Sequence, residues 1–190
     1  MIKRIAIMVV LTLWAAAPLA RELDVNLHDE AAEIGYYVQP DEATSLEDAD
    51  MGGSLYFNEE GDVAASGLIH VLGPPAEGFS PLQLGAGAKG YILYLDEPGR
   101  MVGAVALSGS ARFSIPAQVP QALALRGHIA PSITAFGRAD RLFEATVRYV
   151  FDLTPQASAY LGYRYLRVKM SKESNQTPDD DLHLGVRIQF

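Results

Sequence analysis

One short stretch of the sequence has the spacing of a nucleotide-binding loop. Gly85, Gly87 and Gly90 form a G-x-G-x-x-G pattern, whose glycines let the backbone approach a pyrophosphate at the start of a helix. The residues that follow, Tyr91 to Leu95, are aromatic or aliphatic and predict a strand in place of that helix. We therefore interpret the glycines as small residues that bend a strand or leave interior space, and we expect no cofactor.

The four histidines of the chain, together with serines and carboxylates, could build a hydrolase site. Such a site needs a histidine that takes the proton of a serine, and a carboxylate that orients the histidine. The spacing of these residues matches no catalytic signature, and His128 and His183 fall on strands, where a core histidine is the commoner case. We expect no catalytic residues. An enzyme acting on lipid or peptide is the alternative if either histidine meets a serine and a carboxylate.

Two acidic stretches could offer carboxylate oxygens to Ca²⁺, namely Glu59-Glu60-Gly61-Asp62 and Asp179-Asp180-Asp181. Neither has the complete ligand pattern of a calcium loop, so we expect solvated turns and no metal site. The chain has no cysteine, which excludes disulfides, thiol catalysis and cysteine metal sites. Its formal net charge of −8 argues against nucleic acid as a partner, because the phosphates would be repelled.

The N-terminal residues have the three regions of a secretory signal peptide. Lys3 and Arg4 precede an apolar run from Ile5 to Ala17, and Pro18-Leu19-Ala20 follows. We expect residues 1–20 to be the signal peptide, with cleavage after Ala17 as the alternative, and residues 21–190 to form one domain. An uncleaved anchor helix is disfavoured because the apolar run is shorter than the ~20 residues that span a bilayer.

Residues 141–190 alternate between apolar and polar side chains with a period of two. Between Arg141 and Asp152, one face carries Phe143, Ala145, Val147, Tyr149 and Phe151, and the other carries Leu142, Glu144, Thr146, Arg148 and Val150. The same alternation recurs in residues 157–166 and 182–190. Because successive strand side chains point to opposite sides, each segment predicts a strand with one apolar and one charged surface.

Similar strands and turns follow one another along residues 21–140, among them a strand expected from Gln121 to Ile133, without a segment of helical periodicity. Hairpin turns are expected at Asp29-Glu30, at Glu59 to Asp62 and at Asp96 to Gly99. We expect ten strands, or eight if the short first strand and one weak neighbour are excluded. The fold class is therefore all-β, a transmembrane antiparallel up-and-down β-barrel. A soluble lipocalin-like barrel is the alternative, but its outer faces should be polar.

The charged face of each strand should point into this barrel, because each arginine facing lipid near the midplane costs ~2–4 kcal/mol. We expect a charge cluster in the lumen made of Lys89, Arg112, Arg126, Glu144, Arg148, Arg164 and Arg187. Arg148 and Arg164 should lie near Glu144. The same face carries Asp24, His28, Glu33, Ser54, His70, Ser108, His128 and His183. Side chains can fill a barrel of this size, so a salt-bridged core is expected, with a narrow porin-like channel as the alternative.

Two passages of the sequence resemble the YfaZ-like family of outer membrane proteins. They are the turn and strand from Leu153-Thr154-Pro155 to Leu161-Gly162-Tyr163-Arg164-Tyr165-Leu166, and the ending Leu184-Gly185-Val186-Arg187-Ile188-Gln189-Phe190. The resemblance covers most of residues 21–190. It implies a location in the bacterial outer membrane and offers no catalytic motif whose residues could be carried over.

The end of the chain also resembles the terminal signal of outer-membrane barrels. Its apolar residues are Leu184, Val186, Ile188 and Phe190. This resemblance implies recognition of the last strand by the outer-membrane insertion machinery, while the edge of that strand is still unpaired. The partners we expect are that machinery, periplasmic chaperones, outer-membrane lipid and lipopolysaccharide.

Overall fold

The structure is a computed structural model of the chain and describes residues 20–39, 49–76, 78–171 and 174–190. Most of these residues lie in strands, which are β1 (Ala20–His28), β2 (Ala31–Gln39), β3 (Ala49–Asn58), β4 (Val63–Ala76), β5 (Phe79–Leu95), β6 (Arg100–Ile115), β7 (Gln121–Ala130), β8 (Ala135–Gly137), β9 (Ala139–Thr154), β10 (Ala157–Met170) and β11 (Gln176–Gln189). One turn of 3-10 helix, η1 (Ser132–Thr134), lies between β7 and β8. Within the described ranges, no helix is long and apolar enough to cross a membrane. The expected signal peptide lies outside these ranges, apart from Ala20.

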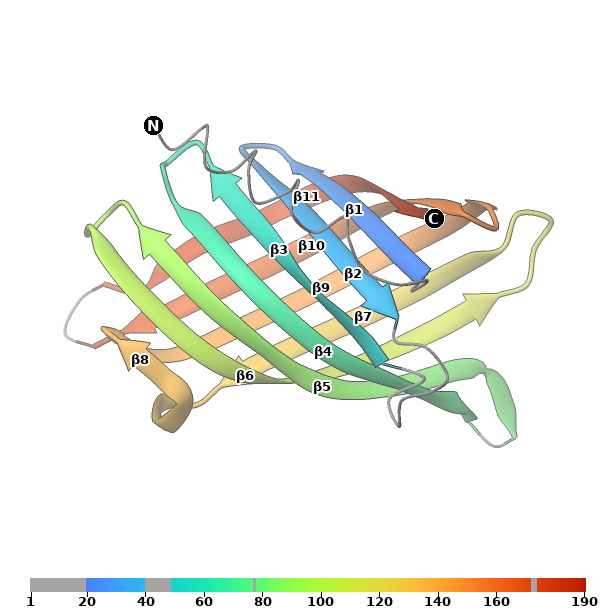
Figure 1. The fold of residues 1–190 in the computed structure, drawn as a ribbon, viewed down its shortest axis with the longest axis horizontal. Coiled ribbons are helices and arrows are strands. Elements are labelled where there is room, and N and C mark those ends of the chain that lie inside the picture. Colours follow the sequence, from blue (N-terminus) through green and yellow to red (C-terminus); the bar gives the residue numbers. More distant parts are fainter. Residues whose placement is uncertain (1–19, 40–48, 77, 172–173) are drawn as a thin grey trace.

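Ten of the strands form a closed antiparallel barrel (Figure 1). Strands β1 to β7 pair in order, β7 pairs with β9, and β9, β10 and β11 follow. The ring closes where β1 pairs with β11, and two backbone hydrogen bonds there join Arg21 with Phe190. The expected transmembrane barrel of ten strands is confirmed. The alternative of eight is wrong, because the short first strand is part of the wall.

Two boundaries differ from the sequence prediction. A strand was expected from Gln121 to Ile133, but β7 ends at Ala130, and Pro131 leads into η1 and the short strand β8 beside β6. The polar loop expected before Leu182 is also wrong, because β11 begins at Gln176. The run of aspartates 179–181 is therefore part of the wall and not a solvated turn. Its uniform charge hides the alternation that a strand normally shows.

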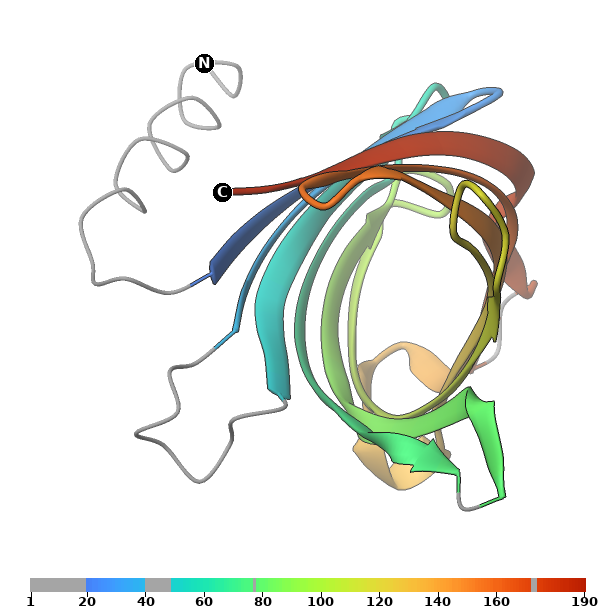
Figure 2. The same cartoon turned by 90° about the vertical axis from the view of Figure 1, so that its right-hand side faces the viewer.

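The two ends of the barrel differ in what they hold. The terminal end holds Ala20 and Gln189, the first and last strand residues, and Figure 2 looks toward this end. The hairpin end holds the tight turns at Asp29-Glu30, Glu59 to Asp62 and Asp96 to Gly99. Gly61 and Gly99 have φ angles of 93° and 70°, which only glycine adopts without strain, and this explains the glycine in each longer turn.

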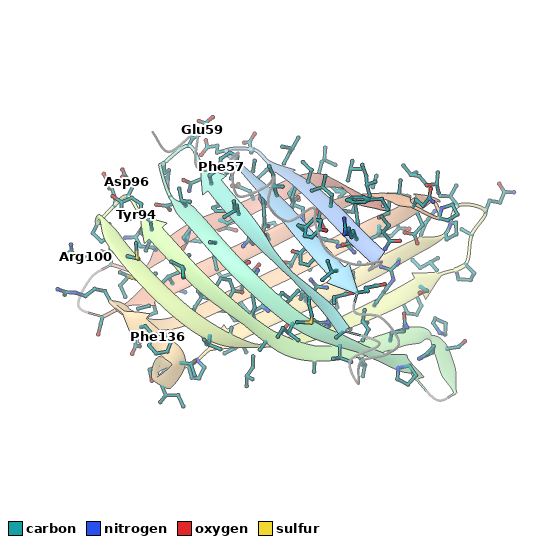
Figure 3. The ribbon with its side chains drawn as sticks, viewed as in Figure 1. Phe57, Glu59, Tyr94, Asp96, Arg100 and Phe136 are labelled. Carbon is teal, nitrogen blue, oxygen red and sulfur yellow. The ribbon has the colours of Figure 1, made fainter. Side chains whose placement is uncertain are left out.

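The outer surface of the barrel is apolar along its length. The outward residues include Val25, Ile34, Leu161, Leu182 and Leu184, all exposed in the isolated chain. Aromatic side chains gather at both rims. At the hairpin end, Phe57, Tyr94 and Phe136 lie next to the charged side chains of Glu59, Asp96 and Arg100 (Figure 3), and at the terminal end the outward rings are Phe113, Phe151 and Phe190. An apolar band between aromatic rims matches a bilayer, which excludes the soluble lipocalin-like alternative.

Candidate functional site

The half of the lumen next to the hairpin end is filled by apolar side chains. We call this cluster the apolar plug, and its larger members are Tyr56, Tyr91, Leu93, Leu95, Val102, Leu142, Leu166, Val168 and Met170, each at most 4% exposed. The hydroxyl of Tyr56 donates to the carbonyl oxygen of Pro178 at 2.6 Å. Two strands separate β3 from β11 in the wall, so this bond crosses the inside of the barrel.

A central ion cluster lies against the plug. The guanidinium of Arg164 contacts three carboxylates, those of Glu144 at 2.9 Å, Glu33 at 3.1 Å and Asp179 at 3.2 Å. Lys89 of β5 also reaches Glu144 of β9 at 2.9 Å, although two strands separate β5 from β9 in the wall. All five residues are at most 8% exposed. Because these charges are paired with one another, the cluster joins strands that are not neighbours in the wall, such as β2 with β10.

Polar side chains complete the central ion cluster. The hydroxyl of Tyr91 donates to Glu144, and that of Ser54 donates to Glu33 at 2.5 Å. His28 contacts the second oxygen of Asp179 at 3.2 Å. Asp179 was expected in a turn, so its place here was missed. The inward face of this strand carries the odd-numbered residues His183, Gly185 and Arg187. Continuing this alternation back to residue 179 could have predicted that Asp179 faces inward.

A second group, the terminal ion cluster, lies nearer the chain ends. The carboxylate of Asp24 accepts hydrogen bonds from Arg148 at 3.3 Å, from Arg187 at 3.0 Å and from the hydroxyl of Tyr160. Glu22 pairs with Arg187 at 2.9 Å. Arg148 was expected near Glu144, but in the structure it contacts Asp24 instead. Register explains this, because Arg148 lies four residues further along β9, toward the terminal end.

The seven residues expected as one lumen cluster all lie on the inward face, but they divide into groups. Lys89, Glu144 and Arg164 belong to the central ion cluster, and Arg148 and Arg187 belong to the terminal one. Arg112 pairs with Asp152 at 3.4 Å near the mouth, where both side chains are partly exposed. Arg126 forms no ion pair with any residue in the described ranges.

A cavity occupies the half of the lumen next to the terminal end. Its inner part, of about 120 Å³, reaches from Arg112 and Arg126 to the central ion cluster. Its outer part, of about 410 Å³, is lined by the strand ends and by the turn around Pro155. Asp50, Arg112 and Arg187 line both parts. The lumen is therefore open at the terminal end and filled at the hairpin end.

The glycines of the G-x-G-x-x-G stretch lie in β5, with no helix after them. A Cβ on Gly85 would lie 2.4 Å from the ring of His70 and 2.6 Å from the hydroxyl oxygen of Ser110. A Cβ on Gly87 would lie 2.2 Å from the backbone oxygen of Ile69. These glycines thus leave interior space, as the sequence indicated, and hold no phosphate loop.

Two of the buried histidines, His128 and His183, lack the hydrogen bonds of a serine–histidine–carboxylate relay in the described ranges. His128 and His183 are 1% and 2% exposed, and no hydrogen bond joins either ring to a serine or a carboxylate among the described residues. The ring of His183 packs against those of His28 and Tyr160. In the same described ranges, no three histidine or carboxylate side chains are grouped to hold a metal ion.

A closed barrel with an apolar outer band, aromatic rims and a charged, largely filled lumen defines an integral membrane β-barrel of the bacterial outer membrane. The chain matches the family model described as "YfaZ precursor" over residues 1–190, and it belongs to that family. The family resemblance and the outer-membrane location expected from the sequence are thereby confirmed.

Two solved structures are partly similar to the chain. The outer membrane channel DcaP of Acinetobacter baumannii matches with a TM-score of 0.41 and 10% identity, over 93% of this chain and 60% of that chain. The chain thus spans about 60% of the channel's length. A structure of the NanC porin matches with a TM-score of 0.43 and 13% identity, over 90% of this chain and 98% of that chain. No curated protein matches the chain.

We expect the protein to be heat-modifiable. A closed ring of ten strands has no open edge, so the detergent-solubilised barrel should stay folded and run faster on a gel until it is boiled. The measurement is electrophoresis of the outer-membrane fraction with and without boiling. Recovery of the protein as a soluble periplasmic monomer, or a single band position under both conditions, would contradict this expectation.

Proposed function

We propose that this outer-membrane barrel does not conduct solutes through its lumen, and that it is an envelope component with a cavity open toward the periplasm. The observation that carries this proposal is the apolar plug. Tyr56, Leu93, Leu142 and Leu166 are at most 2% exposed and pack in one cluster, so water has no access between them. A continuous water path is what a conducting pore needs.

The orientation follows from the chain ends. Bacterial barrels with an even number of strands have both termini on the periplasmic side, which here is the terminal end. The cavity around Arg112 and Arg126 would then open to the periplasm, and the apolar plug would lie toward the outside. The plug and the central ion cluster separate the two sides.

We also propose that the barrel has no enzymatic activity. In support, His128 lies between Ser108 and Glu144 in the strand register, but no hydrogen bond joins its ring or that of His183 to a serine or a carboxylate within the described ranges, and a serine proton relay needs such bonds. The proposed partners are outer-membrane lipid and lipopolysaccharide around the apolar band, with periplasmic chaperones and the insertion machinery during biogenesis. The exposed outward residues, such as Leu161 and Leu182, support the lipid contact.

Planar-bilayer recording tests the proposal of a non-conducting barrel. The purified wild-type protein should give no discrete conductance steps. A variant with Tyr56→Ala, Leu93→Ala and Leu142→Ala should give steps, because these truncations remove three ring or branched side chains from the apolar plug. The matched control carries Leu55→Ala, Ile92→Ala and Phe143→Ala, which truncate outward neighbours and leave the plug intact. Steps from the wild type would favour the narrow porin-like channel instead.

A further inference from the structure

Arg126 is the one cation of the expected lumen cluster without a carboxylate partner in the described ranges. It lies on the inward face of β7 and lines the inner part of the cavity. Placing a guanidinium without an ion pair inside a barrel is costly, because it loses water contacts and has only the more distant charge of Asp50 to offset the loss. A residue that costs stability in the folded protein calls for a role beyond packing.

The surroundings of Arg126 favour anions. Six cationic side chains and three carboxylates line the inner part of the cavity. Asp24, Asp152 and Asp179 pair with four of these cations from outside the lining, whereas Arg126 has no such partner among the described residues. Strand register places two cations diagonally beside Arg126. Arg112 is on the neighbouring strand β6 opposite Ala124, and Arg148 is on β9, also opposite Ala124. Both are therefore diagonal neighbours of Arg126 on the same inner face.

Unused hydrogen-bond donors lie in the same part of the cavity wall. Ser110 is directly opposite Arg126 in the register of β6 and β7, and its hydroxyl has no hydrogen-bond partner among the described residues. His128 is two residues further along β7, is 1% exposed, and has an unpartnered Nδ1. The Nε of Arg148 is also unpartnered. All three residues line the inner part of the cavity together with Arg126. Buried donors normally have partners, so several together indicate a missing acceptor.

We propose that this cavity is a binding site for a small water-soluble anion that carries a carboxylate or phosphate group. Arg126 would hold the anion through its guanidinium, which matches the paired oxygens of either group. Ser110 and His128 would donate to the remaining oxygens, and Arg112 and Arg148 would add positive potential. The ligand enters from the terminal end, since Arg112 and Arg187 line both the inner cavity and its mouth. The site does not depend on whether the barrel conducts.

The test is calorimetric titration of the refolded protein, in nanodiscs of zwitterionic lipid, with inorganic phosphate and with succinate. Wild-type protein should bind at least one of the two with saturation. Arg126→Gln should weaken that binding by about tenfold or more, as expected for loss of a charged hydrogen-bonding partner. Arg126→Lys keeps the charge but lacks the paired donors of the guanidinium. Its affinity for the anion should therefore lie between those of wild type and Arg126→Gln. The matched control is Arg141→Gln, because Arg141 is on the outer side of β9 and its side chain is 67% exposed.

Three results would overturn the proposal. The first is that the wild type shows no saturable binding of either anion. The second is that wild type and Arg126→Gln bind with equal affinity. The third is that Arg141→Gln weakens binding as much as Arg126→Gln does. A repeat in nanodiscs with anionic phosphatidylglycerol separates the two sources of phosphate. Unchanged affinity supports a soluble ligand, whereas competition by the lipid would assign the site to a headgroup and overturn the proposal as stated. Folding is checked independently, because Arg126→Gln removes an unpaired charge and should unfold at the same or a higher urea concentration than wild type.

Discussion

Replacing Glu144 by alanine should lower the free energy of unfolding by ~3–5 kcal/mol, because removing one partner of a buried ion pair leaves the other charge uncompensated. Glu144 accepts hydrogen bonds from Lys89, Tyr91 and Arg164, and two strands separate β5 from β9 in the wall. Its loss leaves Lys89 without its closest carboxylate and Arg164 with one fewer. The measurement is urea-induced unfolding of the protein refolded into lipid vesicles.

The matched control is Asp152→Ala. Asp152 also pairs with an arginine, Arg112, but its side chain is 38% exposed at the mouth of the lumen. An exposed pair of this kind contributes ~0–1 kcal/mol. The double variant Lys89→Met with Glu144→Ala should recover part of the loss, since it removes one of the cations left unpaired. Equal, small effects of Glu144→Ala and Asp152→Ala would mean that the central ion cluster is hydrated in the membrane.

Loss of Phe190 should impair delivery to the outer membrane much more than it impairs the folded barrel. The side chain of Phe190 lies outward in line with Leu184, Val186 and Ile188, and it is 59% exposed in the isolated chain. As a lipid-facing ring it contributes ~1.5–3 kcal/mol of burial. As part of the expected insertion signal, it contacts the machinery before the wall closes. Deletion of Phe190 should therefore strongly lower the amount of folded protein in cells, with a small change in refolding yield in detergent.

Two further variants make this comparison sharper. Phe190→Ala keeps the two backbone hydrogen bonds with Arg21 and removes the ring alone. Phe151→Ala removes another outward ring of the terminal-end rim, away from the chain end. A signal predicts that Phe190→Ala lowers insertion in cells and that Phe151→Ala does not. Equal losses for these variants, or equal losses in cells and in detergent, would leave Phe190 as an ordinary lipid-facing residue.

The wall of this barrel could be predicted from the sequence because strand alternation is local. Phe143, Ala145 and Val147 against Leu142, Glu144 and Thr146 already give the direction of every side chain on β9. The high cost of arginine in lipid then fixes which face is inside. Where the local pattern was interrupted, as at aspartates 179–181 and after Ala130, the predicted boundaries were wrong.

The pairing inside the barrel could not be predicted in the same way. Contacts across the lumen join strands that are not neighbours, such as Arg164 with Glu33 and Arg148 with Asp24. They depend on the tilt and stagger of all ten strands, which no single segment encodes. The apolar plug was missed for the same reason, because Leu93, Leu142 and Val168 are far apart in the sequence. In its own strand, each of them looks like a single apolar residue on an otherwise polar inward face.

The contact between Asp24 and Arg187 has a consequence for the order of assembly. Asp24 belongs to the first strand and Arg187 to the last, and their residues are directly opposite at the seam. Before the seam forms, both side chains are on open edges and can keep their water. Pairing of the two strands brings the charges together and removes that water in one step. Closure of the ring thus neutralises the charges on its own edges. A partly paired seam is disfavoured, and the pairing of the first and last strands should be cooperative.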